Sequence, residues 1–411
     1  MSNRPLRFVH ASDLHLEQPA CGLSEVPDHL REVLVESPFW AAERLFETVL
    51  AEDAELLVLS GDVLDPEKTG PYGPLFLVAQ FERLAERGIE VYWAAGRADP
   101  TANWPAFVPL PPSVHLFPSE RLEHFLHQRD GAPVARLIGV SRPHGPVRAK
   151  DFSPDPTGLF SIAAIYGKAN PEALRPRGID YWALGGSHAR LTPFSSPQVA
   201  HWPGSPQGRR PEEPGPHGCS LVQVDADRRV RITLVPCDVL RWHAEQVAID
   251  PAAGAKDLER RLHDRAKTLR EAAPGIDLMV SWTVAGGGRL AAQLRRGTLA
   301  AELLQGLRSQ FGMTQPALWS VSLASEAVPT LPAQWYEQDT IRGDFLREIR
   351  RLQQLPVGGC QLSVALGEFP PAIERQLTTK DWQLTTDNRQ LLLREAAALG
   401  ADLLSGEEPL P

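Results

Sequence analysis

Short apolar runs alternate with amphipathic patterns over roughly the first 240 residues of this 411-residue chain. Apolar runs of roughly 4–8 residues predict buried strands, and apolar residues three and four positions apart predict helices. The predicted strands span residues 6–11, 56–59, 89–94, 136–140, 160–165 and 179–184. The predicted helices span residues 37–51 and 75–87. Such alternation is typical of a layered α/β domain.

The pattern changes near the end of this domain. Residues 193–218 are rich in Pro, Gly and Ser and lack periodicity, which predicts a loop. Residues 221–235 predict a hairpin around Asp225 to Arg228. The elements expected after residue 241 are a strand at 247–249, a charged helix at 256–271, a strand at 276–284, a helix at 291–311 and a strand at 317–323. They indicate a small α+β domain.

The C-terminal residues predict amphipathic helices. One apolar face comprises Ile341, Phe345, Ile349 and Leu352, and a second comprises Leu392, Ala396, Leu399 and Leu403. The acidic tail from Gly406 to Pro411 is expected to fray. We therefore expect three segments, with boundaries 1–240, 241–331 and 332–411.

Composition is that of an ordinary globular protein, with 43% hydrophobic and 23% charged residues. The net charge of −9 and the pI near 5.8 do not indicate a surface coated for nucleic acid, although a local basic face would suffice for binding. Basic residues gather at Arg209–Arg210, Arg228–Arg231, Arg142–Lys150 and in the helix 256–271. Acidic residues interleave in that helix, which favours a solvated mixed face.

The four cysteines, at 21, 219, 237 and 360, form no CxxC pair, so the chain lacks the pattern of a zinc ribbon or a thioredoxin-like site. Reduced thiols in a cytoplasmic protein are the simpler interpretation. No signal sequence and no apolar stretch long enough for a membrane span is present.

Polar clusters follow three of the predicted strands, where ligands bind in open α/β sheets. They are Ser12–His15, Gly61–Asp65 and Asp180–His188. Carboxylate and imidazole groups together suit manganese, iron or zinc. Each cluster alone has a structural alternative: a helix-capping aspartate, a turn, or a histidine with a purely structural role.

Taken in order, the three clusters resemble the signature of the calcineurin-like metallophosphoesterases, and within them the SbcD/YhaO-like DNA repair exonucleases. Phe8–Leu16 is similar to the opening strand of that branch, and Pro203–Gly218 to its loop after the last metal motif. The resemblance implies a four-layer β-sandwich flanked by helices, a small α+β cap domain and a helical C-terminal segment. It implies DNA as a partner, with an SbcC/YhaN-like coiled-coil ATPase gripped by the C-terminal segment. A homodimer is an open alternative, and no membrane is implied.

The resemblance also implies a ligand set for one of the family's two metal ions: Asp13, His15, Asp62 and His188. The second ion's own ligand positions read Arg97, Tyr166 and Gly186, which are not ligands. Ala98 stands at the usual catalytic histidine. We therefore expect one divalent ion, with manganese favoured and iron or zinc as alternatives.

Arg97 invites a hypothesis. Its guanidinium could bind phosphate in place of the missing positive charge, or pair with Asp62, or simply lie on a surface loop. Histidines at 144, 201 and 217 could in principle approach the site, although structural roles are the simpler interpretation.

Two functions stay open at this point. The first is a one-metal phosphodiesterase or DNA exonuclease with reduced hydrolysis. The second is a non-catalytic subunit that binds DNA ends or acts as a scaffold for the ATPase. The retained ligands favour the first, and the lost ligands and histidine favour the second, because a two-metal site stabilises both the attacking and the leaving oxygen.

Overall fold

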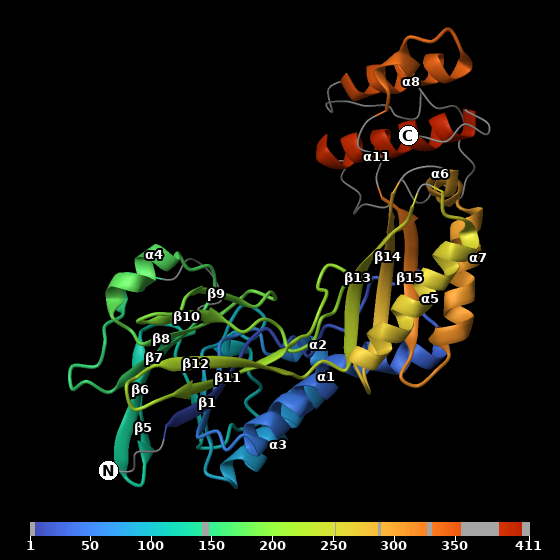
Figure 1. The fold of residues 1–411 in the computed structure, drawn as a ribbon. Helices are drawn as coiled ribbons and strands as arrows, with labels where there is room; N and C mark the ends of the chain where they lie inside the picture. Colours follow the sequence, from blue (N-terminus) through green and yellow to red (C-terminus); the bar gives the residue numbers. More distant parts are fainter. Residues whose placement is uncertain are drawn as a thin grey trace. The chain divides into compact units, whose positions relative to one another are not determined.

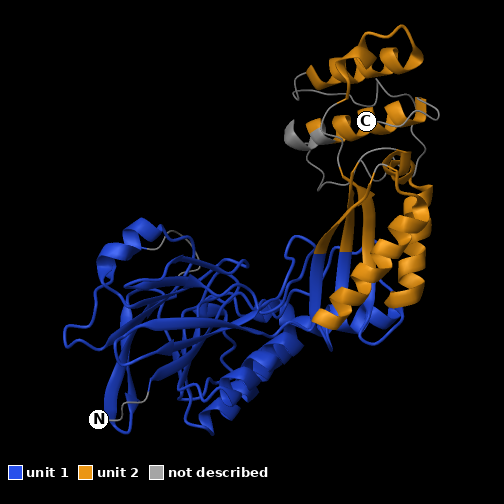
Figure 2. Cartoon of the chain, in the orientation of Figure 1, with its two compact units in different colours: residues 1–243, 273–280, 313–319 blue, residues 244–272, 281–312, 320–411 orange. Residues whose placement is uncertain are grey.

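The computed structural model describes residues 5–141, 148–250, 252–286, 289–326, 331–354 and 386–404. These residues form two compact units (Figure 2). The first unit comprises residues 1–243, 273–280 and 313–319, and the second comprises 244–272, 281–312 and 320–411. The three predicted segments stay a prediction.

Two six-stranded sheets make up most of the first unit (Figure 1). The first sheet has the order β12-β11-β1-β2-β3-β4, from Val230–Pro236, Gly218–Val224, Leu6–Ala11, Leu56–Leu59, Glu90–Trp93 and Val114–Leu116. The second has the order β5-β6-β7-β8-β10-β9, from Glu123–Arg129, Ala132–Val140, Phe160–Tyr166, Tyr181–Gly185, Val199–Trp202 and Leu191–Phe194. Strands β1 to β4 run parallel, as do β6, β7, β8 and β10. Their carboxyl ends therefore gather at one edge of each sheet.

Apolar contacts hold the sheets face to face. Phe8, Val58 and Tyr92 of the first sheet pack with Ile162 and Tyr181 of the second, and all five are fully buried. Burying apolar surface on this scale is the main favourable contribution to folding. The expected β-sandwich is confirmed.

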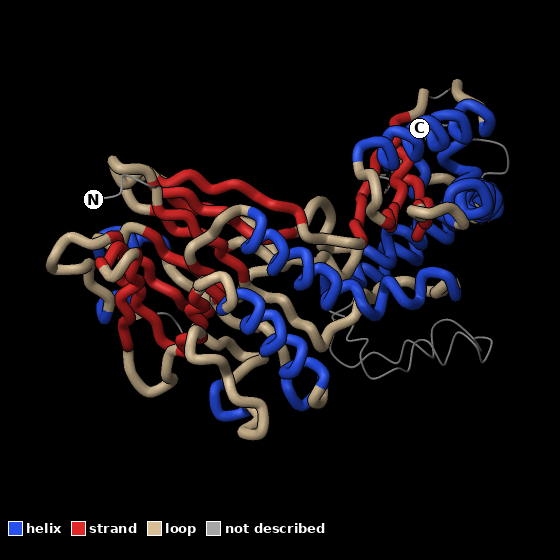
Figure 3. Tube along the Cα trace, turned by 90° about the horizontal axis from the view of Figure 1, so that it is seen from below, coloured by secondary structure: helices blue, strands red, loops and turns tan. Residues whose placement is uncertain are grey.

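Helices cover the outer faces of both sheets (Figures 1 and 3). The helices of this unit are α1 (Asp28–Ala51), α2 (Pro66–Thr69), α3 (Tyr72–Ala85) and α4 (Pro171–Leu174). Phe46 of α1 and Phe81 of α3 pack on β1–β3, while Leu174 of α4 packs on the outer face of the second sheet. This gives the four layers expected of the fold.

A third sheet, of order β13-β14-β15, contributes to both units. Its strands are Leu240–Ala248, Asp277–Ala285 and Leu318–Ser325. The second unit also contains α5 (Ala255–Ala272), α6 (Arg289–Arg295), α7 (Thr298–Leu307), α8 (Ile341–Gln354) and α11 (Thr386–Leu404). A cluster with Leu346, Ile349, Ala397 and Ala401 packs α8 on α11. The helical C-terminal segment is confirmed, whereas its grip on an ATPase stays a prediction.

Several predicted boundaries and faces were wrong. Helix α1 begins at Asp28 rather than residue 37, because buried Leu30 and Leu34 extend it through Pro38. The predicted loop 193–218 contains β10, whose four residues are all buried. A left-handed Gly297 divides the predicted helix 291–311 into α6 and α7.

The predicted apolar face of α11 was also wrong. Leu392, Leu399 and Leu403 are exposed, and the apolar residues of α11 that are buried are the small Ala397, Ala398 and Ala401. A Cβ at Gly400 would overlap the Phe345 ring, so small residues let α8 approach closely.

Residues 142–147, Cys360 and the tail 405–411 lie outside the described residues, and with them Arg142 and His144. Cys21, Cys219 and Cys237 are free thiols. Among the described helices, none is long and apolar enough to cross a membrane.

Gly185, at the end of β8, lies directly against the end of β2. A Cβ at this position would overlap the Ser60 carbonyl oxygen, which belongs to the backbone and cannot turn aside. We expect Gly185→Ala to lower the free energy of unfolding by about 3 kcal/mol, at the upper end for overpacked sites. Urea denaturation measures this loss.

Gly306, in α7, provides the control. It has open space at its Cβ position and an ordinary helical backbone. Gly306→Ala is expected to raise stability by about 0.5–1 kcal/mol. Equal stability of Gly185→Ala and the unaltered chain would contradict the close approach.

Candidate metal centre

The segments after β1 and β2 leave the first sheet side by side, because Ala11 lies beside Leu59 in the parallel register. The Asp13 amide donates to the Gly61 carbonyl at 2.9 Å, and the His15 amide donates to the Asp62 carbonyl at 3.0 Å. Asp13, His15 and Asp62 all have left-handed backbones, with φ of 55°, 45° and 52°. Such conformations are uncommon outside glycine and concentrate at functional sites. These turns aim the three side chains into one space.

Asp13, His15 and His188 form a group whose ligand atoms all lie within 4.8 Å of one another. Asp13 Oδ1 and His15 Nε2 are buried and have no hydrogen-bond partner. Buried polar atoms without partners are rare, because desolvation is then uncompensated. Asp62 Oδ2 lies 3.5 Å from His15 Nε2, so the fourth predicted ligand is at the same place. The chemistry and convergence of these atoms fit a divalent cation.

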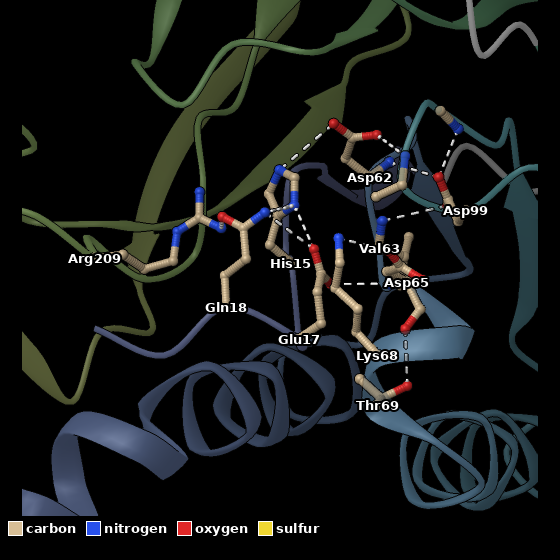
Figure 4. A network of polar contacts seen from close by, with 12 residues as sticks. His15, Glu17, Gln18, Asp62, Val63, Asp65, Lys68, Thr69, Asp99 and Arg209 are labelled. Atoms are coloured by element: carbon tan, nitrogen blue, oxygen red, sulfur yellow. Dashed lines mark hydrogen bonds and ion pairs between the residues drawn. The ribbon is translucent and has the colours of Figure 1, made fainter. Parts of the chain in front are cut away.

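Each histidine of this group has a carboxylate behind it. His15 Nδ1 lies 3.0 Å from Glu17 Oε1, and His188 Nδ1 lies 2.7 Å from Glu213 Oε1. A carboxylate on Nδ1 favours the tautomer that leaves Nε2 as an acceptor, as in carboxylate–histidine–metal arrangements. Figure 4 shows His15 between the carboxylates of Glu17 and Asp62. Both Nε2 atoms are therefore oriented for coordination.

The carboxylates of the site respond differently to burial. Burial raises the pKa of Asp13. For Glu213, burial alone would raise the pKa, but the hydrogen bond with His188 and the Arg209 amide outweigh it and lower the pKa to about 2. Glu213 is therefore an anion throughout the neutral range, as its orienting role requires.

Arg209 is a buried cation at this site, only 2% exposed. Its Nη2 lies 3.2 Å from both ring nitrogens of His188, and its Nη1 donates to Gln18 Oε1 at 3.1 Å. Figure 4 shows it beside Gln18 and His15. Its charge partly balances the carboxylates around it.

Asp99 holds the loop after β3 against the Gly61–Asp62 turn. Its carboxylate accepts from the amides of Asp62, Val63 and Gly96 and from the Trp93 indole, at 2.7–3.2 Å. Burial raises the pKa of Asp99 most, and the nearby Asp62 carboxylate adds to this effect, so that the pKa is about 7. Asp99 positions the backbone that carries Asp62 and Arg97.

Tyr166 and Ala98 both donate hydrogen bonds to the Asp62 carboxylate. The Tyr166 hydroxyl donates to Asp62 Oδ2 at 2.8 Å, and the Ala98 amide donates to Asp62 Oδ1 at 2.7 Å. Burial and the Asp62 carboxylate raise the pKa of the Tyr166 phenol, so it is neutral and can donate. Arg97 is exposed and makes no ion pair within the described part of the chain, so it does not take up the alternative of pairing with Asp62.

Two other histidines take structural roles. His201 lies between Thr192 and Ser220, and His217 bonds to Ser205 and to the Glu213 carbonyl. Neither joins the group of possible metal ligands among the described residues. Asp180, from the third motif, pairs with Arg228 instead.

Comparison with known proteins agrees with this arrangement. Residues 6–189 match the calcineurin-like phosphoesterase family, and residues 242–327 match the middle domain of the metallophosphoesterase YhaO. Residues 6–189 therefore form a calcineurin-like phosphoesterase domain, followed by a segment of the YhaO type. All four predicted ligands lie in the phosphoesterase domain.

Two relatives extend the comparison. The chain is 27% identical over 337 residues to the metallophosphoesterase YhaO of Bacillus subtilis, covering 78% of this chain and 82% of the relative. It is 26% identical over 300 residues to the DNA double-strand break repair protein Mre11 of Methanopyrus kandleri. That match covers 62% of each chain.

Sequence reasoning missed the residues behind the ligands. Glu17 lies two residues after His15 and carried a usable signal, because a carboxylate so close to a ligand histidine can reach its second nitrogen. Glu213 and Arg209 lie in the loop after β10, and nothing in their spacing pairs them with His188. Their roles depend on how that loop folds back.

Glu213→Gln tests the carboxylate behind His188. The amide keeps the size but loses the charge that fixes the histidine, so we expect about 10–100-fold weaker Mn²⁺ binding by isothermal titration calorimetry. The exposed neighbour Glu212 gives the matched control, since Glu212→Gln changes the same charge at the surface. Similar affinities for the two variants would refute the orienting role of Glu213.

Proposed function

We propose that this chain is a DNA phosphodiesterase that works with one divalent metal ion, held by Asp13, His15, Asp62 and His188. The observation that carries the proposal is that two buried acceptors beside His188, Asp13 Oδ1 and His15 Nε2, have no hydrogen-bond partner. The mixed oxygen and nitrogen donors favour manganese, with iron or zinc as alternatives.

DNA is the proposed substrate because of the chain's relatives. One relative is named a DNA double-strand break repair protein, and its match extends over 300 residues. The chain's negative net charge means that a local surface, rather than the whole molecule, would attract the phosphate backbone. An exonuclease role in repair, in company with a coiled-coil ATPase, belongs to this proposal.

The chain's own side chains would prepare the site before substrate arrives. A bound divalent ion supplies Lewis-acid polarisation of a phosphoryl oxygen. Glu17 and Glu213 keep His15 and His188 in the coordinating orientation. Tyr166 and the Ala98 amide hold the Asp62 carboxylate by one hydrogen bond to each oxygen. Little side-chain rearrangement is then needed, which is the electrostatic advantage of a preorganised site.

Two arginines would supply positive charge for a phosphate. Arg209 is buried next to His188, whereas Arg97 is exposed on the loop that Asp99 holds in place. An exposed guanidinium without an ion-pair partner is free to bind an incoming phosphate bidentately. Ala98 offers no proton at the usual histidine position, which supports hydrolysis slower than in two-metal relatives.

Hydrolysis is tested with linear duplex DNA and a chromogenic phosphodiester in the presence of Mn²⁺. We expect measurable activity that falls at least about 100-fold in Asp13→Asn, because even changes behind the ligands lower activity about 10–100-fold. Asp180→Asn serves as control, since Asp180 belongs to the same motif set but pairs with Arg228.

If the unaltered chain shows no Mn²⁺-dependent hydrolysis, even with the ATPase added, the proposed phosphodiesterase activity is rejected. That outcome would favour the alternative function, a non-catalytic DNA-end-binding subunit, which the alanine at position 98 already suggests. Equal DNA binding by the unaltered chain and Asp13→Asn would then be the next result to expect.

Arg97→Ala tests the exposed arginine. Losing a charge-assisted contact to phosphate weakens binding by about 1.5–3 kcal/mol, or roughly 10–150-fold in Kd for a DNA duplex. Fluorescence anisotropy with labelled DNA measures this loss. Arg121→Ala is the control, because Arg121 is also exposed but pairs with Glu123 at 3.7 Å. Unchanged affinity in Arg97→Ala would remove Arg97 from the site.

A further inference from the structure

An aromatic ring fills the space beside the Asp62 carboxylate. A Cβ at Gly61 or at Gly96 would lie 2.7 Å from Tyr166 Cδ2, and a Cβ at Gly186 would lie 3.1 Å from Tyr166 Cε2. Three glycines from three separate loops thus form a cradle for one side chain. Strand register holds the ring there, since Tyr166 pairs with Gly185 across β7 and β8.

The Tyr166 hydroxyl takes the position on Asp62 that a second cation would need. In two-metal sites the ions lie about 3.5–4 Å apart and share a carboxylate. Here Asp62 Oδ2, which also lies 3.5 Å from His15 Nε2, accepts from the hydroxyl at 2.8 Å, and Oδ1 accepts from the Ala98 amide at 2.7 Å. Both groups donate to Asp62, so a second cation on this carboxylate would have to displace their hydrogen bonds.

The surrounding positions cannot replace the missing donors. Gly186 has φ of +87°, so any side chain there would be strained and would also press on the Tyr166 ring. Arg97 is exposed and carries a positive charge. In the described residues, Asp13, His15 and His188 make up the one group of possible metal ligands.

We propose that Tyr166, seated in the cradle of Gly61, Gly96 and Gly186, excludes a second metal ion and fixes Asp62 as a ligand of a single ion. This inference rests on the proposed function for the existence of the first ion. Tyr166 is a positioning residue. Its hydroxyl donates the hydrogen bond that takes the place of a second cation on the Asp62 carboxylate, and its ring fills the space that this cation would need.

The test counts bound Mn²⁺ on the full chain, without substrate, by equilibrium dialysis and elemental analysis. The unaltered chain is expected to bind one ion per chain at saturation. Tyr166→Phe keeps the ring and loses the hydroxyl, so it is expected to bind one ion with altered affinity. Tyr166→His combined with Arg97→Asn replaces the phenol ring by a smaller imidazole and supplies two metal-ligand atoms. This double variant is expected to bind a second ion. Electron paramagnetic resonance would then detect coupling between two nearby Mn²⁺ ions.

The outcomes separate this inference from the proposed activity. Two ions bound by the unaltered chain, or one ion in a folded double variant with Mn²⁺ well above saturation, would overturn the role of Tyr166. Should the double variant fail to fold, two ions on Tyr166→Phe would overturn it equally, because the ring alone is expected to exclude the second. One bound ion without hydrolysis would retain the inference and reject the phosphodiesterase. No bound ion in the unaltered chain would overturn both.

Discussion

The contact between the ends of β2 and β8 is the constraint on which the site depends. Gly185 lies so close to the Ser60 carbonyl that no side chain fits, and the Ser60 hydroxyl donates to the Ala183 carbonyl at 3.0 Å. These contacts tie the active edges of two separate sheets together. Because Asp62 follows one strand and His188 the other, their separation is set by backbone contacts rather than by flexible side chains.

Charge balance is the second organising principle of the site. Asp13, Asp62, Glu17 and Glu213 gather in a region where Arg209 is the buried guanidinium. Carboxylates crowded at low exposure repel one another unless cations or hydrogen-bond donors compensate. The Tyr166 hydroxyl and the Ala98 amide donate uncharged hydrogen bonds to Asp62, and a divalent cation would complete the balance.

The sequence was most informative where strands are parallel and fully buried. The ends of β1, β2 and β8 could be placed from short apolar runs, and the resemblance to the metallophosphoesterases then implied that Asp13, His15, Asp62 and His188 meet. The edge strand β5 was missed, because its polar residues alternate without an apolar run. Strand β10 was missed because four residues among prolines leave no periodic signal.

Contacts that arise from loop folding could not be predicted. Arg209 was visible as a basic residue, but its burial beside His188 depends on the path of the loop after β10. Similarly, the Tyr166 position was recognised as a lost ligand, while the glycine cradle around its ring follows from the meeting of three loops. The spacing of residues along the sequence does not indicate which loops come together in the folded chain.

The left-handed backbones at Asp13, His15 and Asp62 restrict which sequences could occupy this site. Aspartate, asparagine and histidine tolerate that conformation better than most residues, and branched side chains tolerate it poorly. Arg97, Ala98 and Tyr166 have no such backbone. Mutational drift therefore meets unequal resistance across the pocket. Asp13, His15 and Asp62 are confined to a few residue types by their turns, whereas the backbone does not confine Arg97, Ala98 and Tyr166 in this way.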